Sequence, residues 1–310
     1  MSKIGLGIAR FGSALDNEKA SDILNCFIDN GGTLVDTARN YYEWAENGHG
    51  KSEEFLGKYI EDNNCRNDIV ISTKGGVSNR GTKWDIHLDR ISLLDEIKRS
   101  KDALRTDYID IYFLHRDDRD KPVEEIVDTI QEIKDISKAE RIGVANWKCD
   151  RVIEANRYAL RQHYTPFTIV QNWWSLAEYT DSMWNDENCT HMDRDMYEYL
   201  LNNKFYAMGY TSQCKGYFHK IVNSGYDAID DSLKKRIETP TNIKKAMWIK
   251  EYCEQKKIPV SAIVNGYITD NKLSGMALVS TTNIHHLKEI MNSSDICIGS
   301  EVIEELDGII

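Results

Sequence analysis

"YIDIYFLHRDDRDKPVEEIVDTIQEIKDISKAERIGVAN", residues 108–146, is the stretch that decides the fold. It begins and ends with short runs of mostly apolar residues, 108–115 and 141–146, which are typical of buried strands. Between them, over 122–138, apolar residues recur every three or four positions, as on one face of a helix. This order of strand, helix and strand predicts two parallel strands, because the helix returns the chain across the sheet.

The same alternation runs through nearly the whole chain. Eight apolar runs are predicted as strands, at 4–9, 33–38, 68–74, 108–115, 141–146, 167–172, 205–210 and 276–280. Most of the stretches between them are amphipathic and long enough for a helix of about three turns. Eight parallel strand-helix units close into a barrel. The sequence therefore predicts a (β/α)8 barrel, the TIM-barrel architecture, as one domain over residues 1–310, since no change in composition marks a boundary.

Two connections depart from the regular pattern. Residues 173–195 follow the sixth predicted strand and residues 211–233 follow the seventh, and both are long for simple connections. Because barrels of this kind build their sites at the carboxyl ends of the strands, we interpret both as substrate and cofactor loops. The alternative is that they are surface decoration. Residues 300–310 predict one further helix, packed outside the barrel.

Composition limits the class of protein and its partners. The chain is 41% hydrophobic and 29% charged, and it has no apolar tract long enough to span a bilayer. Its net charge of −11 argues against nucleic acid and anionic membrane as partners, since both require a basic surface. The expected partner is a small molecule.

The cysteines and histidines carry no metal-binding pattern. The seven cysteines are scattered singly without a C-x-x-C pair, so we expect free thiols in a reducing compartment. The N-terminus does not have the pattern of a signal peptide, which favours a cytoplasmic location. The eight histidines form no H-x-x-x-H motif and no cluster with cysteine, and no metal site is predicted.

Polar residues interrupt three of the predicted strands near their carboxyl ends. They are Asp36, in "LVDTARNYYEW" (34–44), Lys74 and His115, and Tyr41 follows Asp36 by five positions. Each alone could be a loop cap, a rim charge or a satisfied core group. Together at one barrel mouth they combine an acid, a cation, an imidazole and a phenol. An ammonium beside a phenol is expected to lower its pKa from about 10 and make Tyr41 a general acid.

Several segments, in order along the chain, resemble the aldo-keto reductase family. They are "GLGIARFG", "LVDTARNYY", "GKSEEFLG", "ISTKGG", "LRTDYIDIYFLHRDD", "RIGVANW" and "IVQNWWSL". The resemblance implies a (β/α)8 barrel that reduces carbonyl compounds with NADPH or, less often, NADH. It also implies a catalytic tetrad of Asp36, Tyr41, Lys74 and His115. The spacing in the family motif selects Tyr41 as the acid and leaves Tyr42 as a pocket-wall or packing residue.

The resemblance also implies the cofactor-binding residues. Asn146 and Gln171 match positions that bind the carboxamide of the nicotinamide, and Tyr210 matches the aromatic residue that stacks on its ring. Thr211 and Ser212 match the loop that binds the pyrophosphate.

The resemblance is weakest after the eighth predicted strand. Members that prefer NADPH have cations near the start of this loop and in the following helix, where this chain has Ser280 and His286. The resemblance implies NADP as the cofactor, and NAD is the alternative because a hydroxyl and an imidazole are poor substitutes for two cations. The expected substrate is a small aldehyde or ketone, which includes sugar-like carbonyls.

Two other functions compete with that of a reductase. A cofactor-binding regulatory or partner protein would keep the barrel with vestigial chemistry, and an unrelated hydrolase on the same barrel would bind no nicotinamide cofactor. The complete tetrad favours the enzyme.

Overall fold

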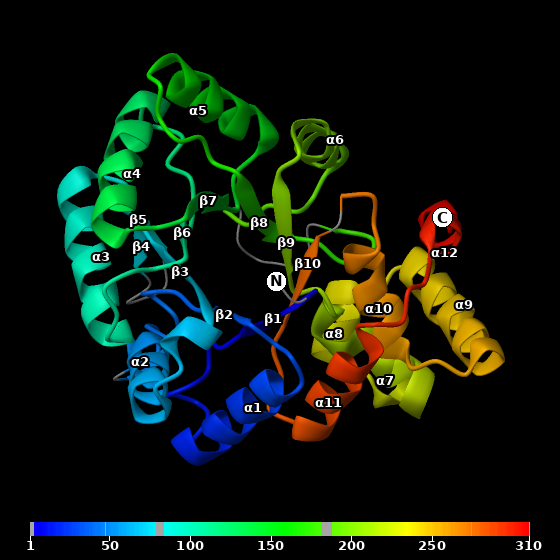
Figure 1. Ribbon diagram of the computed structural model, residues 1–310. Coiled ribbons are helices and arrows are strands. Elements are labelled where there is room, and N and C mark those ends of the chain that lie inside the picture. Colours follow the sequence, from blue (N-terminus) through cyan, green and yellow to red (C-terminus); the bar gives the residue numbers. More distant parts are fainter. Residues whose placement is uncertain (1–2, 47, 79–83, 181–187, 274, 310) are drawn as a thin grey trace.

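Eight parallel strands form a closed barrel at the centre of the molecule (Figure 1). The computed structural model describes residues 3–46, 48–78, 84–180, 188–273 and 275–309. The strands are β1 (Ile4–Gly7), β2 (Leu34–Asp36), β3 (Val70–Gly75), β6 (Ile111–Leu114), β7 (Arg141–Ala145), β8 (Ile169–Trp173), β9 (Tyr206–Tyr210) and β10 (Met276–Val279). Their order around the barrel is β1-β10-β9-β8-β7-β6-β3-β2, and β1 closes the ring by pairing with both β10 and β2. This arrangement confirms the predicted TIM barrel.

Side chains of the strands alternate between two hydrophobic cores. Ile111 and Phe113 of β6 belong to a cluster made only of strand residues, which fills the inside of the barrel. Tyr112 and Leu114 of the same strand belong to a larger cluster shared with the surrounding helices. This period of two is what a barrel wall requires, because successive side chains point to opposite faces.

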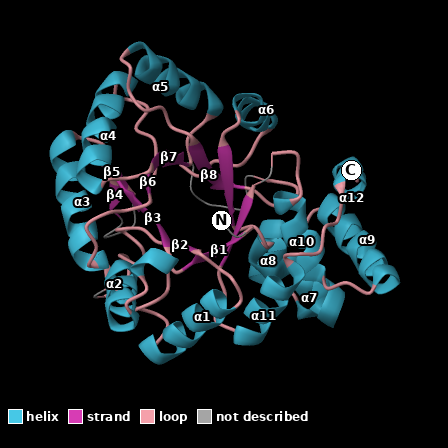
Figure 2. Cartoon of the chain, in the orientation of Figure 1, coloured by secondary structure: helices cyan, strands magenta, loops and turns pink. Residues whose placement is uncertain are grey.

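Helices surround the barrel (Figure 2). They are α1 (Asn17–Asp29), α2 (Lys51–Asn63), α3 (Arg90–Leu104), α4 (Val123–Ser137), α5 (Cys149–Arg161), α6 (Arg194–Asn203), α7 (Tyr217–Ser224), α8 (Asp231–Ile237), α9 (Pro240–Lys256), α10 (Val260–Thr269), α11 (Ile284–Ser293) and α12 (Ser300–Gly308). Several begin at a side-chain cap, as where Asp16 accepts a hydrogen bond from the backbone N–H of Lys19 at 2.9 Å. Such caps satisfy amide groups that the first turn leaves unpaired.

The long connections contain more regular structure than the sequence predicts. Residues 211–233 hold the 3-10 turn η3 (Cys214–Gly216), α7, the turn η4 (Tyr226–Ala228) and the start of α8. In the connection 173–195, residues 181–187 lie outside the described residues. The predicted C-terminal helix is α12, which packs with α7, α8, α9 and α10 in a separate hydrophobic cluster. The antiparallel hairpin of β4 (Val77–Ser78) and β5 (Asp85–Ile86) after β3 was not predicted.

Candidate active site

Three strands deliver the predicted polar residues to one end of the barrel. Asp36 is the last residue of β2, Lys74 is the fifth residue of β3 and His115 directly follows β6. Asp36 pairs in register with Ser72, so Lys74, two residues further along β3, lies on the same face as Ser72. Lys74 is 1% exposed and Asp36 is 2% exposed. Both charges are thus held away from water, where each needs the other.

Lys74 connects the members of the predicted tetrad. Its Nζ donates hydrogen bonds to Asp36 Oδ2 at 2.6 Å and to the Tyr41 hydroxyl oxygen at 2.8 Å. The third donor position is taken by the carbonyl oxygen of Thr37 at 2.9 Å. The ring of His115 lies edge-on to that of Tyr41, with centroids 5.8 Å apart. The structure therefore brings Asp36, Tyr41, Lys74 and His115 together.

The expected acidification of Tyr41 is wrong for this arrangement. Burial, and then the negative charge of Asp36, hold the pKa of Tyr41 well above its usual value. The charge of Lys74 is shared with Asp36, so it does not lower the pKa of the phenol on balance. The phenol accordingly keeps its proton at neutral pH, which is the state that a proton donor requires.

The other two titratable groups respond chiefly to burial. Burial lowers the pKa of Lys74, and the charge of Asp36 opposes that shift. Burial, followed by the charges of Lys74 and Arg116, holds the pKa of His115 well below its usual value. His115 is therefore a neutral imidazole, with one N–H donor and one acceptor nitrogen. Its Nδ1 is buried and has no hydrogen-bond partner within the described residues.

A second buried ion pair holds the segment that carries Tyr41. Arg39 Nη1 donates to Glu53 Oε2 at 2.7 Å, and both side chains are almost completely buried. Glu53 Oε1 accepts a hydrogen bond from Thr73 Oγ1 at 2.7 Å, directly beside Lys74 in β3. This pair ties the segment after β2 both to α2 and to β3. The sequence analysis missed its role, although Glu53 lies within the quoted segment "GKSEEFLG".

The residues predicted to bind the nicotinamide lie beside the tetrad. Gln171 Nε2 donates to Asp36 Oδ1 at 2.9 Å. Asn146 Nδ2 donates to the carbonyl oxygen of His115 at 3.2 Å, and its Oδ1 accepts from the Tyr210 hydroxyl at 2.7 Å. The three side chains thus form one network with the tetrad. Their binding of a cofactor stays a prediction.

The residues predicted to bind the cofactor phosphates share one cavity of about 400 Å³. Thr211, Ser212, Ser280 and His286 all line it, between the carboxyl ends of β9 and β10 and the helices α7, α10 and α11. Ser212 is buried and its hydroxyl donates to the carbonyl oxygen of Leu278 at 2.7 Å, so this hydroxyl joins the two strand ends. Because Thr211 directly follows Tyr210, the cavity continues the barrel mouth. Its hydroxyl and basic lining fits the phosphate end of a dinucleotide.

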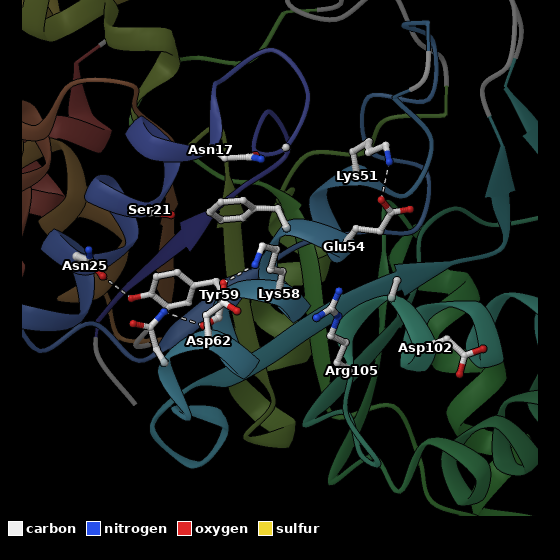
Figure 3. Close-up of a pocket in the computed structure, with 14 residues that line it drawn as sticks. Asn17, Ser21, Asn25, Lys51, Glu54, Lys58, Tyr59, Asp62, Asp102 and Arg105 are labelled. Carbon is white, nitrogen blue, oxygen red and sulfur yellow. Dashed lines mark hydrogen bonds and ion pairs between the residues drawn. The ribbon is translucent and has the colours of Figure 1, made fainter.

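A cavity of greater volume lies elsewhere. It has a volume of about 610 Å³ and is lined mainly by residues of α1, α2 and α3, on the outside of the barrel (Figure 3). Its charged side chains are largely paired with one another, as Lys51 with Glu54 and Lys58 with Asp62. It contains no member of the tetrad, so size alone does not locate the site.

The described residues contain neither a metal-binding cluster nor a membrane-spanning helix. Among them, no group of three or more His, Cys, Asp or Glu side chains is placed to hold a metal ion. Within the same part of the chain, no helix has the length and apolar character needed to cross a membrane.

The chain is similar to known proteins over nearly its whole length. A family model described as "Aldo/keto reductase family" matches residues 3–310. "Aldo-keto reductase YhdN" of Bacillus subtilis is 27% identical over 237 residues, which are 75% of this chain and 65% of that protein. "Probable aryl-alcohol dehydrogenase AAD4" of Saccharomyces cerevisiae is 25% identical over 308 residues, covering 96% of this chain and 89% of the relative.

The fold also matches a solved structure. An aldo/keto reductase from Klebsiella pneumoniae, crystallised with NADP and acetate, superposes with a TM-score of 0.70 at 20% identity, over 98% of this chain and 90% of that one. At this identity the likeness supports the barrel fold alone. Membership of a family rests on the family model, which matches the sequence. The match over residues 3–310 shows that this chain belongs to the aldo/keto reductase family of nicotinamide-dependent oxidoreductases.

Proposed function

We propose that the chain reduces an aldehyde or ketone with NADPH and that Tyr41 is the general acid. The observation that supports this most directly is the position of Lys74 Nζ, within hydrogen-bond distance of both Asp36 and the Tyr41 hydroxyl oxygen. When the phenol gives up its proton, Lys74 already donates to the oxygen on which negative charge develops. Preorganised donors of this kind lower the barrier because they do not reorganise during the reaction.

The remaining residues of the tetrad have distinct roles in this proposal. The bound cofactor supplies the hydride. Asp36 keeps Lys74 charged in a buried place, and Gln171 and Ser72 hold the other carboxylate oxygen of Asp36 at 2.9 and 2.8 Å. His115, neutral and edge-on to Tyr41, donates a hydrogen bond to the substrate carbonyl oxygen and orients it toward the phenol.

The cofactor is proposed to lie along the carboxyl ends of β7 to β10. Asn146 and Gln171 would bind the carboxamide, and Tyr210 would stack on the ring. Thr211 and Ser212 would meet the pyrophosphate, with Ser280 and His286 at the adenosine end. NADP is the proposed cofactor, and NAD is the alternative because neither Ser280 nor His286 supplies the permanent cation of a Lys or Arg side chain for an extra phosphate.

Aromatic carbonyl compounds are the proposed substrate class. The ring centroids of Trp173 and Tyr210 lie 6.3 Å apart. The guanidinium carbon of Arg116 lies 4.9 Å from the ring centroid of Trp84. These large flat side chains sit on segments that follow or end barrel strands, where substrate would enter. Several relatives are named as aryl-alcohol dehydrogenases. This favours aromatic aldehydes over the sugar-like carbonyls also considered. A cytoplasmic location is proposed because none of the seven cysteines, all within the described residues, forms a disulfide bond.

A single-turnover experiment tests the proposal. The chain is mixed with NADPH and a panel of benzaldehydes and sugar aldehydes, and the nicotinamide absorbance is followed. Wild type should consume NADPH with at least one benzaldehyde, and Tyr41→Phe should be slower by roughly 10²- to 10⁴-fold, the typical contribution of acid catalysis. Tyr42→Phe is the matched control and should stay near wild type. Equal rates for wild type and Tyr41→Phe would contradict the proposal, and cofactor binding without turnover would favour a regulatory protein.

A further inference from the structure

Basic side chains gather at the cavity that continues the barrel mouth. Lys215 comes from η3, His219 and Lys220 come from α7, and His286 comes from α11, and all four line the cavity of about 400 Å³. Of these, the sequence analysis identified only His286. Lys215 and Lys220 thus give this side of the cavity positive charges that the loop after β10 does not supply.

Two of these residues form an imidazole pair. The ring centroids of His219 and His286 lie 5.1 Å apart, with the ring planes at 63°. Nδ1 of His219 lies 3.7 Å from Glu289 Oε1, and Nε2 of His219 lies 3.1 Å from Asn223 Nδ2. Burial lowers the pKa of His219, with the charge of Glu289 opposing that shift. Without ligand, this shift reduces the positive charge that His219 adds to the cavity at neutral pH.

The other charged groups around the pair come from three elements. Lys215 of η3 and Lys220 of α7 are positive, and Glu289 of α11 is negative. Lys220 Nζ lies 3.7 Å from Asp230 Oδ2, so part of its charge is balanced already. The residues that α10 contributes to the lining are Val260, Ser261 and Val264, which do not titrate. The remaining titratable side chains of the lining are the two imidazoles, His219 and His286.

We infer that the His219–His286 pair, together with Lys215, binds the additional phosphate that distinguishes NADPH from NADH, and that it takes up a proton when it does so. This inference rests on the proposed function, which places the adenosine end of the cofactor in this cavity. An anion within about 4–6 Å favours the charged form of an imidazole, so a phosphate monoester would draw a proton onto the pair. The preference for NADPH over NADH should then rise as pH falls toward about 6, where the phosphate itself begins to protonate.

Binding measurements without substrate test this inference. Isothermal titration calorimetry of the full chain with NADPH and with NADH, in buffers of different ionisation enthalpy between about pH 6 and 8, gives the affinity and the number of protons taken up. We expect NADPH binding to take up close to one proton and its Kd to rise by up to about tenfold per pH unit, as linkage requires for one proton. NADH binding should show neither effect.

Variants at His286 separate proton uptake from general loss of binding. His286→Asn should reduce the proton uptake and flatten the pH dependence for NADPH, and an unchanged urea unfolding midpoint reports an intact fold. His286→Arg carries a permanent charge, so it should bind NADPH tightly at every pH tested without uptake. His285→Asn, at the neighbouring position, is the control and should keep the wild-type pH dependence.

The outcomes distinguish this inference from the proposed function. If wild type binds both cofactors with the same pH dependence and no extra proton, the inference is overturned while the reductase proposal stands. If wild type binds neither cofactor, the proposed function fails as well. If Tyr41→Phe is fully active but NADPH binding takes up a proton, only the assignment of the general acid fails.

Discussion

Lys74 and Asp36 form a buried ion pair across neighbouring strands, with Nζ 2.6 Å from Oδ2. The same ammonium donates to the Tyr41 hydroxyl oxygen, so one cation serves both a carboxylate and a phenol. Because the carboxylate is so close, the cation does not make the resting phenol acidic. It instead stands ready to stabilise the phenolate after proton transfer.

Removing Lys74 should damage both stability and activity. Lys74→Met leaves Asp36 buried without its cation, and breaking such a pair typically costs about 3–5 kcal/mol of unfolding free energy. Replacing both partners, as Asp36→Asn with Lys74→Met, should recover part of that stability but none of the carbonyl reduction. Urea unfolding and single-turnover rates on the same samples measure the two effects. Recovered activity in the double variant would show that the pair has no role in catalysis.

The Arg39–Glu53 pair should stabilise the segment that carries Tyr41. Arg39→Met and Glu53→Gln should each lower the unfolding free energy by several kcal/mol, and the double variant should cost less than the two together, because each single change strands a buried partner. The exposed pair of Lys58 and Asp62 is the control, and its cycle should give a coupling of at most about 0.5 kcal/mol. Additive losses at Arg39 and Glu53 would refute this coupling.

Gly50 should tolerate no side chain, because the guanidinium of Arg39 occupies the space that a Cβ would need. It has a φ of 73°, and a Cβ there would lie 1.6 Å from Arg39 Nη2. Gly50→Ala should therefore disturb the ion pair and slow the reduction, besides a backbone cost of about 1 kcal/mol. Gly31→Ala provides the matched comparison, because Gly31 has a φ of 82° and nothing within 4 Å of a Cβ. Gly31→Ala should lose stability but keep the wild-type rate of reduction. Equal turnover in the two variants would mean that the position of Arg39 does not matter.

His87 should make stability depend on pH. Its hydrogen bond to Glu96, with Nε2 2.9 Å from Oε1, raises its pKa above the unfolded value of about 6.5. A group whose pKa rises on folding stabilises the folded state below the unfolded pKa, and this contribution is lost as pH rises through the folded pKa.

The prediction concerns the difference between wild type and His87→Gln. That difference in unfolding free energy, from urea titrations, should be largest near pH 6 and shrink at higher pH. Using the difference removes other titrating groups such as His115, whose lowered pKa acts in the opposite direction. A difference that grows with pH would reverse the assigned sign and exclude the Glu96 hydrogen bond as its cause.

The sequence by itself determined the barrel and the place of the tetrad. The periods of two and of about four residues are local properties, and eight alternating units have one common way to close. Parallel strands also bring their carboxyl ends to one mouth, so polar residues at the ends of the second, third and fourth predicted strands must meet there. For this reason Asp36, Lys74 and His115 could be grouped before any distance was known.

Only the tertiary structure decided the electrostatics of the site and its supports. The pKa of Tyr41 depends on the burial of the phenol and on the negative charge of Asp36 beside it, which no spacing in the sequence reveals. In the sequence Glu53 is an ordinary acidic residue of a helix. Only the structure shows that it is buried and paired with Arg39. The imidazole pair joins His219 of α7 and His286 of α11, which are 67 positions apart in the sequence. Burial and long-range distance decide these properties, because the energy of a charge depends on everything packed around it.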